Sequence, residues 1–296
     1  MRTVTASGPR RPGAAPRLAD AVSLDFPADS PAALDLDVRV FFGDMARPYG
    51  LPLDEDRLGR GAGQSYAEMG EAVITALVPP ERPVDLLVEV FASPDVQPGR
   101  AASVHLSTFC PGRPFAFALT DQGTSGVFSA LRLAGSYLAD EGFARALVLV
   151  LEQSGLPYRP PDGTPVADRA AAVGLLLDRD AGIELAPDGD TVRVPAAEAY
   201  ERVAKAAAEL RAAEPDAVLL LGPALAELHD QQEAESRTRA ADLPTAPPPR
   251  PGNPYTGLWS ALAGSLPRLR ADRSHALLAE YDPLLGLLDL ARLHVI

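Results

Sequence analysis

The chain contains a repeat with an offset of about 131 residues, and this repeat constrains the fold more than any other feature. Segment 126–131 reads GVFSAL, and segment 257–262 reads GLWSAL. Each copy follows a glycine-containing turn, at 121–125 and at 251–256. A unit of this length is much longer than a solenoid repeat, so the pattern indicates a duplicated α/β half-domain.

The repeat extends on both sides of these segments. Upstream lie two apolar segments, 83–88 and 215–220, each preceded by an amphipathic helical pattern, at 66–77 and at 200–210. Downstream lie the apolar segments 146–151 and 276–279. Near-continuous apolar strands are typical of sheets covered by helices on both faces. Their alternation with helices predicts an α/β layered fold.

The remaining pattern divides the chain into three parts. Residues 1–18 are rich in Gly, Pro and Arg and are expected to form a disordered tail. An N-terminal half is expected at 19–180 and a C-terminal half at 181–296. Further strands are expected at 36–42, 84–91, 115–119, 145–151, 172–177, 191–194 and 217–221. Further helices are expected at 98–106, 126–139, 196–213 and 224–240.

Charge and composition argue against several classes of partner. The net charge is −13 and there is a single lysine, so nucleic acid and anionic membranes are not expected partners. No apolar run reaches the ~20 residues that span a bilayer, and no signal-peptide pattern is present. We therefore expect a cytoplasmic protein. With Cys110 as its one cysteine, the chain can form neither an intramolecular disulfide nor a cysteine zinc site.

Motifs in both halves carry a resemblance to a known family. In the first half they are Ser93-Pro94-Asp95, Gly126, Ala130-Leu131, Gly142, Ala146-Leu147 and Glu152, and in the second Pro251-Gly252-Asn253, Gly257 and Ser260-Ala261-Leu262. In this spacing the sequence resembles the thiolase-like superfamily and, within it, the ketoacyl-ACP synthase III group. The resemblance covers 66–296 and is strongest up to Glu152. It implies a thiolase-like five-layer αβαβα fold built from two duplicated half-domains.

The same resemblance implies that two of the family's catalytic groups are replaced. The family condenses acyl groups with a cysteine at a helix N-terminus, where the helix dipole and amide donors lower the thiol pKa. By register that cysteine position is Thr124, followed by Ser125. The family's histidine position is Gly222, and its asparagine is retained as Asn253. Two glycine-rich turns of the family are also replaced here by segments without glycine, at 167–172 and 281–285. These departures imply a lost active site.

Several residues allow a second interpretation. Thr124 or Ser125 could act as an oxygen nucleophile, or both could cap the following helix. Asn253 could position a thioester, or it could have only a structural role in its turn. Cys110 is expected to be a buried small hydrophobe, and His105 and His229 are expected to be surface groups.

The function expected from the resemblance is a non-catalytic or impaired partner subunit of an active ketosynthase, in polyketide or fatty-acid-like specialised metabolism. The alternative is a divergent acyltransferase that uses Ser125 or Thr124 to transfer an acyl group from coenzyme A or acyl carrier protein. A third possibility is an interaction protein without acyl chemistry. No cofactor or metal is expected.

The expected partners follow from the same resemblance. We expect a homodimer, or a heterodimer with the active ketosynthase, formed along the strand 115–119, because an unpaired edge of this kind would be left exposed. Acyl carrier protein is a further possible partner, with Arg145, Arg159 and Arg169 as local basic groups.

Overall fold

The computed structural model describes residues 16–27, 36–60, 63–140, 142–154, 156–160, 166–235 and 252–295. Its strands are β1 (Arg17–Phe26), β2 (Leu86–Val90), β3 (Phe115–Leu119), β4 (Arg145–Glu152), β5 (Ala170–Asp178), β6 (Ile183–Pro187), β7 (Val192–Arg193), β8 (Val218–Leu221), β9 (Ala276–Asp282) and β10 (Leu287–His294). Its helices are α1 (Leu36–Ala46), η2 (Arg47–Tyr49), α2 (Glu55–Arg60), α3 (Tyr66–Leu77), α4 (Ala102–Phe109), η3 (Gly123–Ser125), α5 (Gly126–Leu138), α6 (Ala196–Ala213), α7 (Pro223–Glu235) and α8 (Gly257–Asp272).

The strands lie in one continuous sheet, in the order β3-β2-β4-β5-β1-β6-β10-β9-β8, with β7 paired to β10. From the β1–β6 junction the order runs outward as β1-β5-β4-β2 on one side and β6-β10-β9-β8 on the other. On both sides the pairing is the same: β4–β5 and β9–β10 are antiparallel, whereas β2–β4 and β8–β9 are parallel. The repeat in the sequence is therefore repeated in the sheet topology. Within the described residues β3 extends the first side alone.

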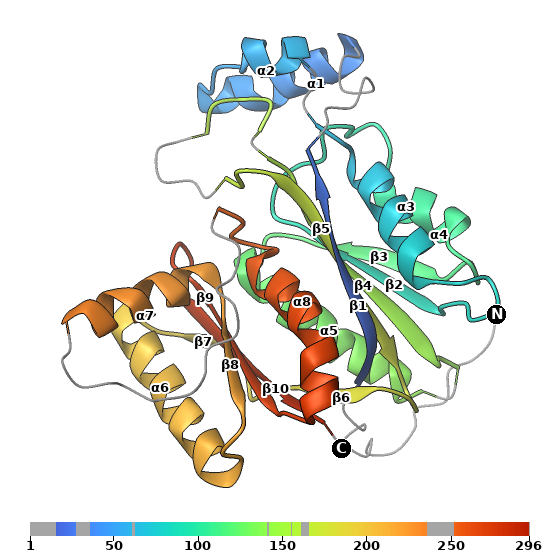
Figure 1. The fold of residues 1–296 in the computed structure, drawn as a ribbon. Helices are drawn as coiled ribbons and strands as arrows, with labels where there is room; N and C mark the ends of the chain where they lie inside the picture. Colours follow the sequence, from blue (N-terminus) through green and yellow to red (C-terminus); the bar gives the residue numbers. More distant parts are fainter. Residues whose placement is uncertain are drawn as a thin grey trace, which may run out of the picture.

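The helices divide the molecule into layers, which Figure 1 shows. Helices α3 and α4 cover one outer face, helices α6 and α7 cover the other, and α5 and α8 lie between the two parts of the sheet. Phe128 of α5 and Trp259 of α8 occupy equivalent positions of the repeat, and their rings meet edge to face with centroids 5.2 Å apart. The predicted α/β fold with an αβαβα layer order is confirmed.

Most predicted elements are present, and one was assigned the wrong type. Segment 36–42 was expected to be a strand but belongs to helix α1, whose buried residues Val38, Phe42 and Ala46 are four positions apart. Residues four positions apart lie on one face of a helix. The three consecutive apolar residues at 40–42 (VFF) indicated a strand instead. Helix α4 begins at Ala102 rather than at 98, and α7 begins at Pro223. The end of the helix predicted at 224–240 lies outside the described residues.

The strand β1 was missed in the sequence. It pairs antiparallel with β5 along its whole length, from Arg17↔Asp178 to Phe26↔Ala170. Residues 1–15 of the predicted tail lie outside the described residues, but Arg17 and Leu18 belong to the sheet, so the tail boundary at 18 is wrong. The alternation of Val22, Leu24 and Phe26 was the available signal. The division into halves at residue 180 stays a prediction.

Candidate functional site

The turn that opens α5 lies at the carboxyl end of β2. Gly126 allows this approach, because a Cβ atom there would lie 2.9 Å from Cγ1 of Val90. Gly123 has φ +52°, a left-handed backbone conformation that favours glycine. These two glycines hold Thr124 and Ser125, both buried, at the N-terminus of α5. The structure therefore places both residues in the turn between the sheet and a central helix.

The hydroxyl groups of Thr124 and Ser125 have no hydrogen-bond partner among the described residues. At Ser125, the residue before α5, no side-chain capping hydrogen bond is present in the described structure. The interpretation of these two residues as helix caps is therefore wrong. Buried hydroxyl groups without partners are uncommon in folded proteins.

A carboxyl group from the other half caps this turn instead. Oδ2 of Asp282 accepts a hydrogen bond from the backbone N–H of Thr124 at 3.0 Å. Its Oδ1 accepts from the N–H groups of Leu284 and Leu285, at 3.0 and 2.8 Å, which fixes the tip of the β9–β10 hairpin. A Cβ atom on Gly123 would lie only 1.9 Å from Oδ2 of Asp282. The hairpin tip therefore covers the turn.

The turn that opens α8 is capped in the same way by Glu152. The carboxyl group of Glu152 accepts from the N–H groups of Tyr255 and Thr256, from Oγ1 of Thr256 at 2.6 Å, and from Nδ2 of Asn253 at 3.0 Å. Nδ2 of Asn253 also donates to the carbonyl oxygen of Arg169. Asn253 is thus buried at the centre, and its amide nitrogen is used to hold the turn.

The two caps are related by the repeat. Glu152 ends β4 of the first half and caps α8 of the second, whereas Asp282 ends β9 of the second half and caps α5 of the first. The two acids are 130 residues apart. In the sequence alone, Glu152 is a match to the family's register and Asp282 is one residue of a replaced turn. Their shared position, at the end of a repeated strand, was the signal that could have identified both.

Burial raises the pKa of several groups in this centre. Burial raises the pKa of Glu152, and the hydrogen bonds from Thr256 and Asn253 oppose this only in part. Burial also raises the pKa of Tyr255 to about 12, with further increases from the nearby Asp282 and Glu152. Because both acids act on Tyr255, the two turns converge on one centre.

Gly222, which the sequence register aligns with the family's histidine, follows β8 and has its space filled by another side chain. A Cβ atom on Gly222 would lie 2.1 Å from Oε1 of Glu280. Glu280 is buried, and burial raises its pKa well above the usual range. The nearby carboxyl groups of Asp282, Asp289 and Glu152 raise it further. A buried carboxyl group therefore occupies this position, which nothing in the sequence predicted.

A small cavity of about 140 Å³ opens beside the centre. Its lining includes Glu152, Gln153, Tyr158 and Tyr255, but neither Thr124 nor Ser125. Sites for small molecules usually enclose ~300–1,000 Å³. This cavity is therefore smaller than an ordinary ligand site, and the two hydroxyl groups do not line it.

The remaining polar candidates lie outside this centre. Cys110 is buried, and burial raises its pKa to about 11, so it is an unreactive thiol as expected. His105 contacts Glu71 at 2.6 Å, and Nδ1 of His229 lies 3.1 Å from the hydroxyl of Tyr200. Among the residues that the structure describes, no group of three His, Cys, Asp or Glu could hold a metal ion. Nor does any described helix combine the length and the apolar character that a membrane crossing requires.

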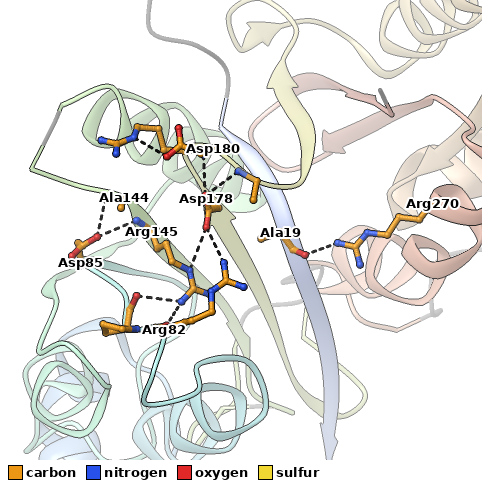
Figure 2. Close-up of polar contacts among 11 residues, drawn as sticks. Ala19, Arg82, Asp85, Ala144, Arg145, Asp178, Asp180 and Arg270 are labelled. Atoms are coloured by element: carbon orange, nitrogen blue, oxygen red, sulfur yellow. Dashed lines mark hydrogen bonds and ion pairs between the residues drawn. The ribbon is translucent and has the colours of Figure 1, made fainter.

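Arg145, one of the three expected basic groups, is structural. Figure 2 shows its guanidinium group lying against Asp178, with hydrogen bonds to the backbone oxygens of Arg82 and Pro83. The side chain is buried at the amino end of β4, so it cannot contact a carrier protein. Arg159 and Arg169 are exposed.

No protein-family model and no curated protein matches the chain in sequence. Solved structures do match it. ChlB3, described as an acyltransferase, is 17% identical with a TM-score of 0.62, and the match covers 95% of this chain and 98% of ChlB3. PksG, an HMG-CoA synthase from Bacillus subtilis, is 14% identical with a TM-score of 0.57, over 95% and 79% of the two chains. AbyA1, a tetronic acid condensing enzyme, is 16% identical with a TM-score of 0.56, over 94% and 99%. At these identities the likeness establishes the fold: the chain has the thiolase-like fold of these enzymes.

Proposed function

We propose that this chain is a ketoacyl-ACP synthase III-like protein that does not catalyse condensation. It acts in the cytoplasm as the partner subunit of an active ketosynthase, in polyketide or fatty-acid-like biosynthesis. In that role it completes the dimer and helps to shape the acyl tunnel of its partner. It needs no cofactor.

One observation carries this proposal: the Thr124 N–H is already bound to Asp282 at 3.0 Å. Condensing chemistry places a developing oxyanion against amide donors at the helix N-terminus. Here a carboxyl group of the chain itself takes that donor. A negative charge at this point also disfavours an alkoxide on Thr124, because like charges repel at short range.

A surface for the partner subunit supports the proposal. Strand β3 ends the sheet, and within the described residues its outer edge has no paired strand. Phe115 on this strand is 55% exposed, and it contacts Phe117 and Tyr137 in an aromatic cluster. Exposed apolar edge strands form intermolecular sheets unless they are protected. A second subunit of the same fold would cover this edge.

The test is co-expression of this chain with a ketosynthase that retains the catalytic cysteine, followed by native mass spectrometry of the purified complex. The expected species is a one-to-one heterodimer, which the Phe115→Lys variant should weaken. Tyr49→Lys is the matched control, because Tyr49 is 78% exposed and lies away from the sheet edge. A homodimer that condenses acyl groups by itself would refute the proposal.

The second candidate function is acyl transfer through Thr124 or Ser125. The observation that favours it is the pair of buried hydroxyl groups without partners at the N-terminus of α5. The donor would be acyl-CoA or acyl carrier protein, the latter contacting the exposed Arg159 and Arg169. Incubation with radiolabelled acyl-CoA tests it, with Thr124→Ala and Ser125→Ala as controls. Without any label on the native protein, this second function is refuted.

A further inference from the structure

Gly222 is a glycine for a reason other than its backbone conformation. The glycines of this chain with left-handed φ values do not include Gly222. Its N–H donates to the carbonyl oxygen of Ala279 at 2.8 Å, and its carbonyl oxygen accepts from Ala226, so its backbone continues β8 into α7. Any L-residue can adopt such a conformation. The constraint is therefore space: Oε1, Cδ and Oε2 of Glu280 would lie 2.1–2.3 Å from a Cβ atom at this position.

The carboxyl group of Glu280 is enclosed among other acids. The residue is 2% exposed, and its neighbours are the carboxyl groups of Asp282, Asp289 and Glu152. Asp289 lies directly opposite Glu280 across the β9–β10 pair. Oε2 of Glu280 is buried without a hydrogen-bond partner in the described part of the chain. Such a group is costly to bury, so its position must be stabilised by packing.

We propose that Glu280 is a built-in occupant of the space for a side chain at position 222, so that the chain closes its own reaction centre from within. Glu280 fills the space beside Gly222, while Asp282, two residues later on the same strand, takes the Thr124 amide. Both acids lie on β9, so one strand fills the space beside Gly222 and also occupies the Thr124 amide. We call this pair of contacts the block. This inference rests on the proposed function, because the centre is identified by its place in the ketosynthase-like fold.

The block has a direct consequence for any return of the family's catalytic groups. A cysteine at 124 and a histidine at 222 cannot be introduced together while Glu280 keeps its place, because the imidazole needs the volume of the carboxyl group. Removing Glu280 is the change that must come first. Substitution at 222 and substitution at 280 should therefore be strongly coupled.

A double-mutant cycle on thermal stability tests this coupling. Gly222→Ala alone should lower the Tm by roughly 5 °C, because overpacking a filled core costs ~1–3 kcal/mol. In the Glu280→Ala background the same substitution should lower it by less than about 1 °C. Glu280→Gln is the matched control, because it keeps the volume without a charge, and Gly222→Ala should cost as much there as in the native protein.

The outcomes are separate from those of the proposed function. Equal losses of Tm for Gly222→Ala in the native and Glu280→Ala backgrounds would overturn the inference. If Gly222→Ala does not fold, recovery of folded protein in the double variant supports the block, and failure to recover it contradicts the block. The cycle measures stability only, so acyl labelling of the native chain would refute the non-catalytic function without changing its result.

Discussion

Two carboxyl groups, those of Asp282 and Glu152, accept hydrogen bonds from backbone N–H groups in the turns that open α5 and α8. A helix N-terminus attracts negative charge, and enzymes use this to stabilise thiolates and oxyanions. In this chain the attraction is satisfied by internal acids. Chemistry at Thr124 would have to compete with a carboxyl group that belongs to the chain itself.

A thiol placed at position 124 should report this competition. In Thr124→Cys, prepared with Cys110→Ser, we expect a thiol pKa at or above the ordinary ~8.5, despite the helix N-terminus. Asp282→Asn in the same background should lower that pKa, because the nearby negative charge is removed. Thiolate absorbance as a function of pH measures both values. A pKa below ~7.5 with Asp282 present would show that the carboxyl group does not oppose ionisation.

Glu89 provides a residue-scale prediction on pH. It is buried in β2, and burial, followed by the nearby Asp95, raises its pKa to about 8. A raised folded-state pKa gives stability that is complete below the unfolded pKa of about 4.5 and is lost as pH rises through about 8. The free energy of unfolding should therefore fall between these values. Glu89→Gln should make the fall shallower in urea titrations across pH 5–9, and an identical slope in both proteins would contradict this.

At the scale of elements, the caps connect the two halves. Glu152 extends from β4 to the start of α8 and accepts four hydrogen bonds there. Asp282 extends from β9 to the start of α5. Each helix N-terminus is thus fixed by a strand of the other half, so neither half completes its central helix alone.

Loss of Glu152 should therefore cost more than loss of an ordinary cap. Glu152→Ala should lower the free energy of unfolding by ~3 kcal/mol or more, because it leaves several buried donors without an acceptor. Glu68→Ala is the comparison: Glu68 completes the capping box of α3 with Ser65, and its loss should cost ~1 kcal/mol. Chemical denaturation measures both. Equal costs would mean that Glu152 is only a local cap.

The elements also show what the sequence could and could not reveal. Helix α3, strand β3 and the paired segments around α5 and α8 were predictable, since hydrophobic period and repeat agreed there. Helix α1 was mistaken for a strand because its buried positions are separated by exposed apolar residues such as Val40 and Phe41. Glu280 could not be found, because a buried acid in an apolar strand has no signature until its neighbours across the fold are known.

At the scale of the whole molecule, the repeat builds a pseudo-twofold sheet whose two outer edges differ: only the first half carries an additional strand, β3, within the described residues. The first half ends in β3, and within the described residues the second ends in β8. An exposed aromatic edge on one side only gives a subunit one surface for sheet extension. A dimer formed there would place the two turns that follow β3 and open α5, one from each subunit, on either side of the shared edge.

Sedimentation equilibrium tests this surface on the chain by itself. Without an active ketosynthase present, the same edge should pair two copies of this chain. Phe115→Lys should weaken that self-association at least tenfold, because a charge on the edge disfavours strand pairing. Tyr49→Lys should leave it unchanged. Loss of the dimer with Tyr49→Lys but not with Phe115→Lys would place the interface elsewhere.

Intact-protein mass spectrometry after incubation with acyl-CoA and acyl carrier protein donors tests the central claim most directly. A non-catalytic subunit should keep its native mass with every donor, while a ketosynthase with an intact cysteine, run in parallel, gains one acyl group. A mass increase of one acyl group on the native chain, absent in Thr124→Ala or Ser125→Ala, would contradict the claim and establish acyl transfer.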